Sequence, residues 1–494
     1  MKKFCLLLLA FVLSMGALAG CGEDNSNKLV IWSAIPLHKN YESALKTDPT
    51  NRSGLYTQYV LETFAELHPD VTVQIEDRGW AETLNEEIVR TATTTQPDII
   101  GTESYTQNLI DLDYLWAVEW EEDVQNDLIP ASTEIFMRDG GLYAMPIYTN
   151  SLVFLYNEQL LFDAGCPTTL VDGSLQVLPP ETWAEVLYCC ERVQAYLEQN
   201  YIKGDSLNAR RYGAYILDNV RGVAAGFRGE LYASLGGGSL FKEGALSKSA
   251  TASDLNFNDP ANVLGYELMR ELYSYAPVDS YAGSTEQEMR NRLLAGQVAM
   301  TVEHPDLISL PKTAGVDLRV GKVPVFTDGT MEENLTSYAY SENNRDGVHN
   351  GRTKLNSANI LAGNVGWGIT KSSEKKELAM DFIRIALSPE AQVYLYELDT
   401  RLPSTKSGIA ALKESTNATV LKYADAMKYS IAEIEDSYSA NPTVNLVGGI
   451  ACFEKNIADC WISYETFTRT LYTTQDDIQT ALNTLHSSIA EKLS

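Results

Sequence analysis

The residues best suited to chemistry are polar and aromatic side chains that follow short apolar segments typical of buried strands. Trp32 and Ser33 end the run Lys-Leu-Val-Ile-Trp-Ser, and Glu303 and His304 follow the run Val-Ala-Met-Thr-Val. An aromatic face covers the apolar C–H groups of a sugar, while carboxylate, amide and hydroxyl groups bond its hydroxyls. Because loops after parallel strands are where α/β folds bind ligands, these residues are candidates for binding a small polar molecule.

Carboxylates of this kind could also belong to an enzyme. A glycan hydrolase needs two positioned carboxylates, and the 66 acidic residues of the chain allow many pairs. The sequence contains neither a Gly-x-Ser-x-Gly nucleophile motif nor a His-Glu-x-x-His metal motif. The glycines at 236–238 lack the Lys-Ser/Thr of a phosphate-binding loop. We therefore expect no catalytic residues and keep a secreted glycan-active hydrolase as the alternative.

Cysteine and histidine spacing argues against a metal site. No Cys-x-x-Cys pair or His/Cys cluster has zinc spacing, so we expect no metal and no cofactor. Beyond residue 21 an odd number of cysteines remains, which cannot all pair internally, and the pairing stays open. The adjacent pair at 189–190 lies in a helical pattern and predicts buried thiols. The remaining cysteines are Cys166, Cys189, Cys190, Cys452 and Cys460.

The N-terminus has the pattern of an export signal. It starts Met-Lys-Lys, continues with an apolar run and ends Leu-Ala-Gly-Cys at Cys21. The ending resembles the bacterial lipobox, which implies cleavage before Cys21 and a diacylglycerol on its sulfur; an ordinary signal peptide is the alternative. We expect a signal peptide at 1–20 and a lipid-anchored tether at 21–27. The mature protein is then exported and held at the cell membrane, facing the extracellular space or periplasm.

Length and charge restrict the classes of protein to which the chain can belong. A chain of 494 residues exceeds one ordinary core, so two or three folding units are expected. The net charge of −28 repels nucleic acid and anionic lipid, and we expect no nucleic-acid partner. After the signal no segment reaches membrane-spanning length.

The hydrophobic periodicity predicts an α/β protein. Strand and helix patterns alternate over 28–100, which is typical of a parallel sheet. Pro-Pro-Glu-Thr-Trp at 179–183 opens a helix that continues to 197, and we expect Trp183 in the core. Further strands are predicted at 151–156, 298–302 and 364–370, and further helices at 259–273, 287–294 and 374–387.

Several blocks, taken in order along the chain, resemble the extracellular solute-binding protein family 1, the maltose-binding-protein-like group. Each block alone is weak, but unrelated chains rarely share so many in one order. The resemblance implies a periplasmic-binding-protein-like α/β fold, in which three crossing strands join two lobes around a ligand cleft. The blocks include Leu-Val-Ile-Trp at 29–32, Pro-Asp-Ile-Ile at 97–100, Pro-Glu-Thr-Trp at 180–183, Leu-Ala-Gly-Gln-Val-Ala-Met at 294–300 and Gly-Trp-Gly-Ile at 366–369.

The same resemblance implies a division of the chain. The N-terminal lobe is expected at 28–147 plus 325–363, and the C-terminal lobe at 148–324 plus 364–494. Two segments depart from the family pattern as insertions and leave the outline of the cleft open. The crossings are expected near 146–150, 323–327 and 363–368, and the insertions at 36–53 and 327–358.

The resemblance also assigns ligand contacts. The loop after 97–100 contributes contacts in the family, the segment at Phe227 resembles its aromatic contact loop, and Trp461 lies near a position that often supplies a stacking aromatic. An aromatic residue beside a strand is, however, often a core residue. The predicted ligand-binding set is Trp32, Ser33, Glu103, Tyr105, Tyr148, Asn150, Phe227, Arg228, Glu303, His304, Asn364, Trp367 and Trp461.

The function that the resemblance implies is a substrate-binding lipoprotein of an ABC importer. It would close its lobes by a hinge motion on a small neutral solute, expected to be a mono- or oligosaccharide, and pass it to a permease. A phosphate ligand would require several basic residues, and only Arg228 in the set is basic. A polyamine or other non-sugar solute stays open because Glu103 and Glu303 could pair with a cation. We expect a monomer.

Overall fold

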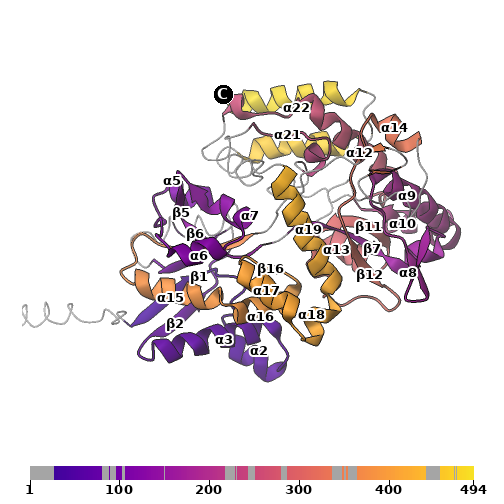
Figure 1. Cartoon of the computed structure of the whole chain (residues 1–494). Coiled ribbons are helices and arrows are strands. Elements are labelled where there is room, and N and C mark those ends of the chain that lie inside the picture. Colours follow the sequence, from indigo (N-terminus) through magenta and orange to yellow (C-terminus); the bar gives the residue numbers. More distant parts are fainter. Residues whose placement is uncertain are drawn as a thin grey trace, which may run out of the picture.

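A computed structural model of the whole chain shows two lobes, each built around a β-sheet (Figure 1). Each lobe mixes helices with a mixed sheet, which confirms the predicted α/β class. The structure describes residues 27–79, 88, 96–102, 106–149, 151–216, 229, 231–242, 251–279, 286–336, 348–349, 352–353, 364–440, 457–471, 473 and 476–493.

The first lobe contains a six-stranded sheet in the order β16-β6-β15-β3-β1-β2. β1 runs parallel to β2 and β3, as the alternating pattern over 28–100 predicts. β15 runs antiparallel to both β3 and β6, so β1, β2, β3 and β6 all end at one edge of the sheet. The strands are β1 (Lys28–Trp32), β2 (Thr72–Glu76), β3 (Ile99–Thr102), β6 (Ala144–Thr149), β15 (Val365–Ile369) and β16 (Leu402–Pro403).

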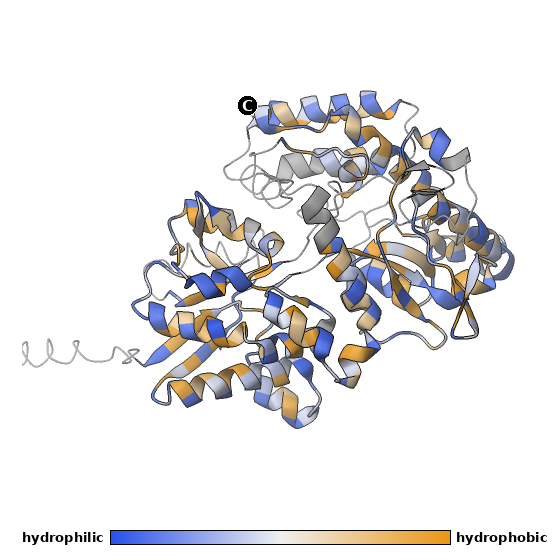
Figure 2. Ribbon diagram, in the orientation of Figure 1, coloured by the Kyte–Doolittle hydropathy of each residue, from blue (hydrophilic) through white to orange (hydrophobic). Residues whose placement is uncertain are grey.

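Amphipathic helices bury one face of this sheet. Leu29 and Ile31 of β1 join the core beneath them, whereas Trp32 points to a smaller core on the opposite face. Phe64 and Phe382 meet edge to face within the main core, with ring centroids 5.2 Å apart. The helices are α3 (Arg52–Leu67), α15 (Lys376–Ala386) and α16 (Pro389–Asp399), and α15 shows the alternation of hydrophobic and hydrophilic residues expected of a half-buried helix (Figure 2).

The second lobe contains a four-stranded sheet in the order β10-β11-β7-β12. β10 and β11 are parallel, and β7 runs antiparallel to β11 and β12. The described helices around this sheet include α9, α12, α21 and α22. The elements are β7 (Val153–Asn157), β10 (Gly213–Tyr215), β11 (Val298–Glu303), β12 (Leu318–Gly321), α9 (Trp183–Leu197), α12 (Val263–Tyr273), α21 (Ile457–Thr470) and α22 (Ile478–Leu493).

Helix α9 begins where the sequence predicts. Thr182 and Glu185 form a capping box, in which the Thr182 hydroxyl accepts from the Glu185 N–H at 3.3 Å and the Glu185 carboxylate accepts from the Thr182 N–H at 3.1 Å. Trp183 is fully buried and meets Tyr215 of β10 with ring centroids 6.3 Å apart. Its expected core position is therefore confirmed.

The chain passes between the two sheets more than once. β6 leads into β7 across residue 150, which agrees with the crossing expected at 146–150. A second passage runs from β12 to β15, partly outside the described residues. A third follows β16, because α19 (Ala424–Ala440) packs against β7 and β12 of the second lobe. Figure 1 shows α19 lying between the two lobes.

The observed division differs from the expected one at two places. Residues 364–399 were assigned to the C-terminal lobe, but β15 pairs with β3 and β6, and α15 and α16 pack in the first lobe. Val325 was assigned to the first lobe, but it pairs with Thr182 of the second lobe. The next residue, Phe326, lies in the core of the second lobe. The expected crossing at 323–327 and residues 364–368 of the one expected at 363–368 therefore lie within lobes. The lobe to which each segment belongs was decided by strand pairing with residues far away in the sequence, which local patterns do not reveal.

Both insertions contain regular structure where the structure describes them. The first, expected as a loop, holds α2 (Tyr41–Thr47), which packs on α3. The second holds α14 (Met331–Thr336) and a short pairing of β13 (Val348–His349) with β14 (Arg352–Thr353). Residues 327–330 are also described, and the remainder of this second segment lies outside the described residues.

Candidate functional site

The pairing of the strands places one end of each sheet, formed by strand termini, next to the first crossing. We call this end the edge of the sheet. In the first lobe, β6 ends at Thr149 on the edge where β15 begins. In the second lobe, β11 ends at Glu303 on the edge where β7 begins, because Glu303 pairs with Val153. Only residues 150–152 separate β6 from β7. The two edges are therefore joined by a short segment, and we define them together as the strand-end site.

Buried hydroxyl and amide groups form the first-lobe part of the strand-end site. The Thr149 hydroxyl donates to Asn364 Oδ1 at 2.9 Å, and both residues are almost completely buried. The Thr102 and Thr106 hydroxyls lie 2.8 Å apart at the end of β3. Hydrogen bonding fixes the direction of these groups, as an ordered polar site requires. Asn364 was predicted as a ligand contact on the third crossing, and it lies just before β15, within the first lobe.

The loop after β1 is held in an unusual conformation. Ser33 has φ of +50°, and its hydroxyl donates to the Gly79 carbonyl at 2.7 Å and accepts from the Arg78 N–H at 3.2 Å. The backbone approaches β3 so closely that a Cβ at Gly101 would lie 2.0 Å from the Ser33 carbonyl oxygen. This close approach positions Ser33 beside the ends of β2 and β3.

Trp32 lies beneath an arginine rather than at the surface. Its side chain is 1% exposed, and the Arg78 guanidinium lies 4.8 Å from its ring centroid. Arg78 also pairs with Glu76 at the end of β2. Arg78 was not among the predicted residues, because a loop arginine carries no periodic signal. In this conformation Trp32 presents no free face to a ligand.

Tyr148 is covered in the same way. Pairing of β16 with β6 puts Leu402 opposite Thr149 and so brings the preceding residue, Arg401, beside the crossing. Arg401 Nη1 donates to the Tyr148 hydroxyl at 2.7 Å, and its guanidinium lies 4.5 Å from the ring centroid. Arg401 was not predicted, because the position of β16 next to β6 is set by tertiary pairing. The first-lobe edge thus carries cationic groups that stack on aromatic rings.

The second-lobe edge carries carboxylates. Glu303 is 3% exposed, and its carboxylate accepts from the His304 N–H at 2.9 Å. His304 precedes the Pro305–Ile308 turn of 3-10 helix, so it also shapes that turn. The buried Glu433 of α19 accepts from the Val323 N–H at 2.6 Å just beyond β12. Carboxylates at this edge can accept hydrogen bonds from ligand hydroxyl or amino groups.

Trp367, predicted as a ligand contact, is a core residue. It is 1% exposed, its indole N–H donates to the Ile35 carbonyl at 3.1 Å, and its ring stacks on Phe382 with centroids 5.8 Å apart. The prediction failed because residue type and strand position do not reveal which face of a sheet is covered. Several other predicted residues fall outside the described side chains, and their roles stay predictions. These are Cys21, Glu103, Tyr105, Asn150, Phe227, Arg228 and, within α21, Trp461.

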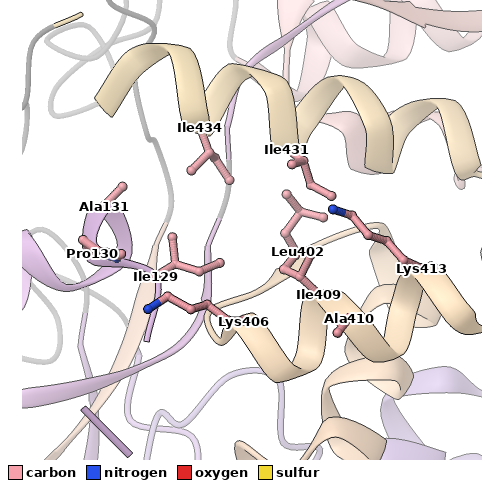
Figure 3. A pocket seen from close by; sticks show the side chains of 10 residues that line it. All are labelled: Ile129, Pro130, Ala131, Leu402, Lys406, Ile409, Ala410, Lys413, Ile431 and Ile434. Atoms are coloured by element: carbon pink, nitrogen blue, oxygen red, sulfur yellow. The ribbon is translucent and has the colours of Figure 1, made fainter. Parts of the chain in front are cut away.

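An apolar pocket of about 470 Å³ lies between the first lobe and α19 (Figure 3). In Figure 3, Ile431 and Ile434 of α19 point toward Leu402 and Ile409. Ile409 belongs to α17 (Lys406–Glu414), and α7 (Pro130–Thr133) supplies further lining residues. This wall is mostly aliphatic, Lys406 and Lys413 are the polar side chains that line it, and it lacks the aromatic faces that suit a sugar. The strand-end site therefore remains the better candidate.

The described residues contain neither a metal-binding cluster nor a membrane-spanning helix. Within those ranges no group of three His, Cys, Asp or Glu side chains is arranged to hold a metal ion. Of the helices in the described part, none combines the length and apolar character needed to cross a bilayer.

Two α/β lobes, several passages of the chain between them and polar strand ends at the first passage define a bilobal binding protein. The sequence comparison agrees with this class. Residues 60–422 match the profile of the bacterial extracellular solute-binding proteins, and the chain belongs to that family. This match confirms the resemblance to extracellular solute-binding proteins that the ordered sequence blocks indicated. Membership of an extracellular family implies export.

Two relatives align along nearly the whole chain. The galactooligosaccharide-binding protein of Bacillus subtilis (strain 168) is 21% identical over 491 residues, covering 98% of this chain and 95% of its own. Among solved structures, the GacH receptor of Streptomyces glaucescens GLA.O superposes with a TM-score of 0.61 at 17% identity, covering 94% of this chain and 98% of the receptor. GacH was solved unliganded and in complex with acarbose and an acarbose homolog. The structural likeness shows a shared fold.

Proposed function

We propose that this protein is the substrate-binding component of an ABC importer and that it binds a neutral oligosaccharide between its lobes. The observation that supports this most directly is the strand-end site, where the Thr149–Asn364 pair faces the same crossing as Glu303. The amides, hydroxyls and carboxylates at this site are the groups that bond sugar hydroxyls. The names of the two relatives, a galactooligosaccharide-binding protein and an acarbose receptor, favour an oligosaccharide.

The proposed mechanism is closure of the two lobes on the ligand. A ligand that bonds both edges binds the closed form better than the open form and so shifts the population toward it. The short segment between β6 and β7 and the helix α19 supply the places where the chain can bend. A membrane permease would then receive the closed, loaded form. We also propose that Cys21 carries the lipid that holds the protein at the membrane.

We propose that the predicted residues divide into ligand contacts and supporting residues. Ser33, Asn364, Glu303 and His304 lie at the strand ends, while Trp32, Tyr148 and Trp367 have supporting positions. Stacking aromatics are then expected from Tyr105, Phe227 and Trp461. In this proposal the first group bonds ligand hydroxyls, and the second group supports the strand ends from within the core.

Calorimetry with the mature chain tests this function. Galactooligosaccharides, maltooligosaccharides and acarbose form the sugar arm, and spermidine and glycerophosphodiesters form the non-sugar arm. We expect saturable binding in the sugar arm and a decrease of the radius of gyration in small-angle scattering with the bound sugar. Binding confined to spermidine would replace the sugar by a polyamine. Release of reducing ends from a sugar would favour the glycan hydrolase.

A further inference from the structure

Three buried cysteines lie together in the second lobe. Cys166 follows α8 (Glu158–Asp163), and Cys189 and Cys190 are neighbours on α9. All three are free thiols in the structure and belong to the same hydrophobic core. The strand-end site and the proposed transport function use none of them. Their role is therefore a separate question.

The backbone brings Cys166 to one face of α9. The Cys166 N–H donates to the Leu161 carbonyl at 3.0 Å, which turns the chain back after α8. The preceding Gly165 has φ of +73°, and a Cβ built on it would lie 3.7 Å from Arg192 Nη1. Arg192 and Cys189 are three residues apart on α9 and so share a face. Gly165 therefore lies beside α9, and Cys166 packs in the same core as Cys189.

The two thiols interact directly. A hydrogen bond between Cys189 and Cys166, together with burial, raises the pKa of the Cys189 thiol well above its ordinary value. Cys190 lies on the adjoining face of the helix, where burial raises the pKa of its thiol. A protonated, buried thiol is a poor nucleophile. Oxidation of Cys189 in the finished lobe would be slow, whereas the folding chain exposes its sulfur to an oxidant.

We propose that Cys166 and Cys189 are joined by a disulfide in the exported protein and that Cys190 remains a thiol. The inference rests on membership of an extracellular family, whose compartment permits disulfides, and not on the ligand. A disulfide-bearing oxidoreductase accepts two electrons and two protons from the pair. One sulfur–sulfur bond forms between Cys166 and Cys189 while the oxidoreductase disulfide becomes two thiols.

The expected consequence is a stabilised second lobe. The bond closes the stretch of chain that contains the hairpin of β8 (Thr168–Val171) and β9 (Ser174–Val177) and the first half of α9. Closing a loop of this size restricts the unfolded chain. We expect the melting temperature to fall on the order of 10 °C when the bond is absent.

Peptide mapping of the exported full chain tests the proposal. The protein is denatured in N-ethylmaleimide without reductant, digested and examined by mass spectrometry, with fragmentation between the adjacent cysteines to distinguish Cys189 from Cys190. We expect a Cys166–Cys189 cross-link and alkylated Cys190. Alkylation of both Cys166 and Cys189, or a cross-link of either to another cysteine, would overturn the proposal.

Serine variants distinguish the loss of the disulfide from the effect of placing a hydroxyl group in the core. Cys190→Ser is the matched control, since Cys190 is equally buried on the same helix. We expect Cys190→Ser to keep the cross-link and to lose thermal stability when refolded with reductant. Cys166→Ser and Cys189→Ser should melt at the same temperature with and without reductant. A reductant response of Cys166→Ser equal to that of Cys190→Ser would contradict the assigned pair.

Discussion

The Thr149 hydroxyl donates a 2.9 Å hydrogen bond to Asn364 Oδ1, and this bond links β6 to the start of β15 at the first crossing between the lobes. The two residues are 215 positions apart in the chain. The bond orients an amide at the edge of the sheet just before the chain leaves the first lobe. Its position makes it the most direct link between the fold and the proposed site.

Replacement of Thr149 by valine tests that link. The change keeps the shape of the side chain but removes the donor to Asn364, so we expect sugar affinity to fall at least about tenfold, or ~1.4 kcal/mol. Stability should fall by about 1–3 kcal/mol, because a buried acceptor loses a partner. Calorimetry and urea unfolding measure the two effects.

The matched control for this variant is Thr57→Val. Thr57 is also fully buried, and its hydroxyl donates to the Ser53 carbonyl at 2.7 Å within α3. We expect the control to lose stability and to keep its sugar affinity. Equal dissociation constants for the two variants would remove Asn364 from the ligand site.

Tryptophan variants distinguish a core residue from a ligand contact. Trp367→Ala should reduce the free energy of unfolding by about 3–5 kcal/mol, because it leaves a cavity beside Phe382. The folded fraction should bind sugar normally. Trp461→Ala should behave in the opposite way, with weak binding and little loss of stability. A Trp367→Ala protein that folds stably but no longer binds sugar would contradict the core assignment.

Gly101 is expected to tolerate no side chain. A Cβ at this position would lie 2.0 Å from the Ser33 carbonyl oxygen, which is backbone and cannot rotate away. We expect Gly101→Ala to cost about 3 kcal/mol or more of folding stability, measured by urea unfolding. Gly321→Ala is the control, because the nearest atom to its Cβ lies at 3.6 Å. A loss in the control as large as in Gly101→Ala would show that the close approach is not the cause.

The pair of Asp279 with Arg292 predicts a pH dependence of stability. Two hydrogen bonds from Arg292, at 2.6 and 2.8 Å, lower the pKa of Asp279. Because the folded-state pKa is depressed, the contribution is complete above the ordinary aspartate pKa of about 3.9 and is lost as the pH falls through the lower folded value. The carboxylate is partly exposed, so we expect only about 0.5–1 kcal/mol.

Urea unfolding of Asp279→Asn at several pH values measures this contribution. The variant should be less stable than the parent at pH 7, and the difference should vanish as the pH falls through the depressed pKa of Asp279. Asp317→Asn removes the acid of an exposed pair with Arg319 and should change stability little at any pH. A difference for Asp279→Asn that is the same at every pH would assign it to packing rather than charge.

Much of the secondary structure could be predicted from local patterns. The strand at 28–32 and helix α9 both follow from apolar periodicity and from a proline, threonine and glutamate at the helix start. Helix α2 was missed for a physical reason. It buries none of its residues, so it has no apolar stripe that periodicity could reveal.

The candidate site could be predicted only in part. Glu303 was expected at the end of a strand and ends β11, whereas Asn364, expected on a crossing, lies just before β15 within the first lobe. Arg78 and Arg401 were not expected, because each reaches its aromatic partner, Trp32 or Tyr148, only after strands far apart in sequence have paired. An aromatic residue next to a strand shows the same local pattern whether it is covered or open.

The sequence by itself determined the family, the α/β class and the start of many elements, because these depend on patterns within a few residues of one another or on ordered blocks. The tertiary structure decided which lobe receives β15 and the helices after it, and which aromatic rings are covered. Those outcomes depend on hydrogen-bond pairing and packing between distant segments, such as β15 with β3 and β6. Local periodicity marks a strand as buried, but only its neighbours decide where it lies and what its ends face.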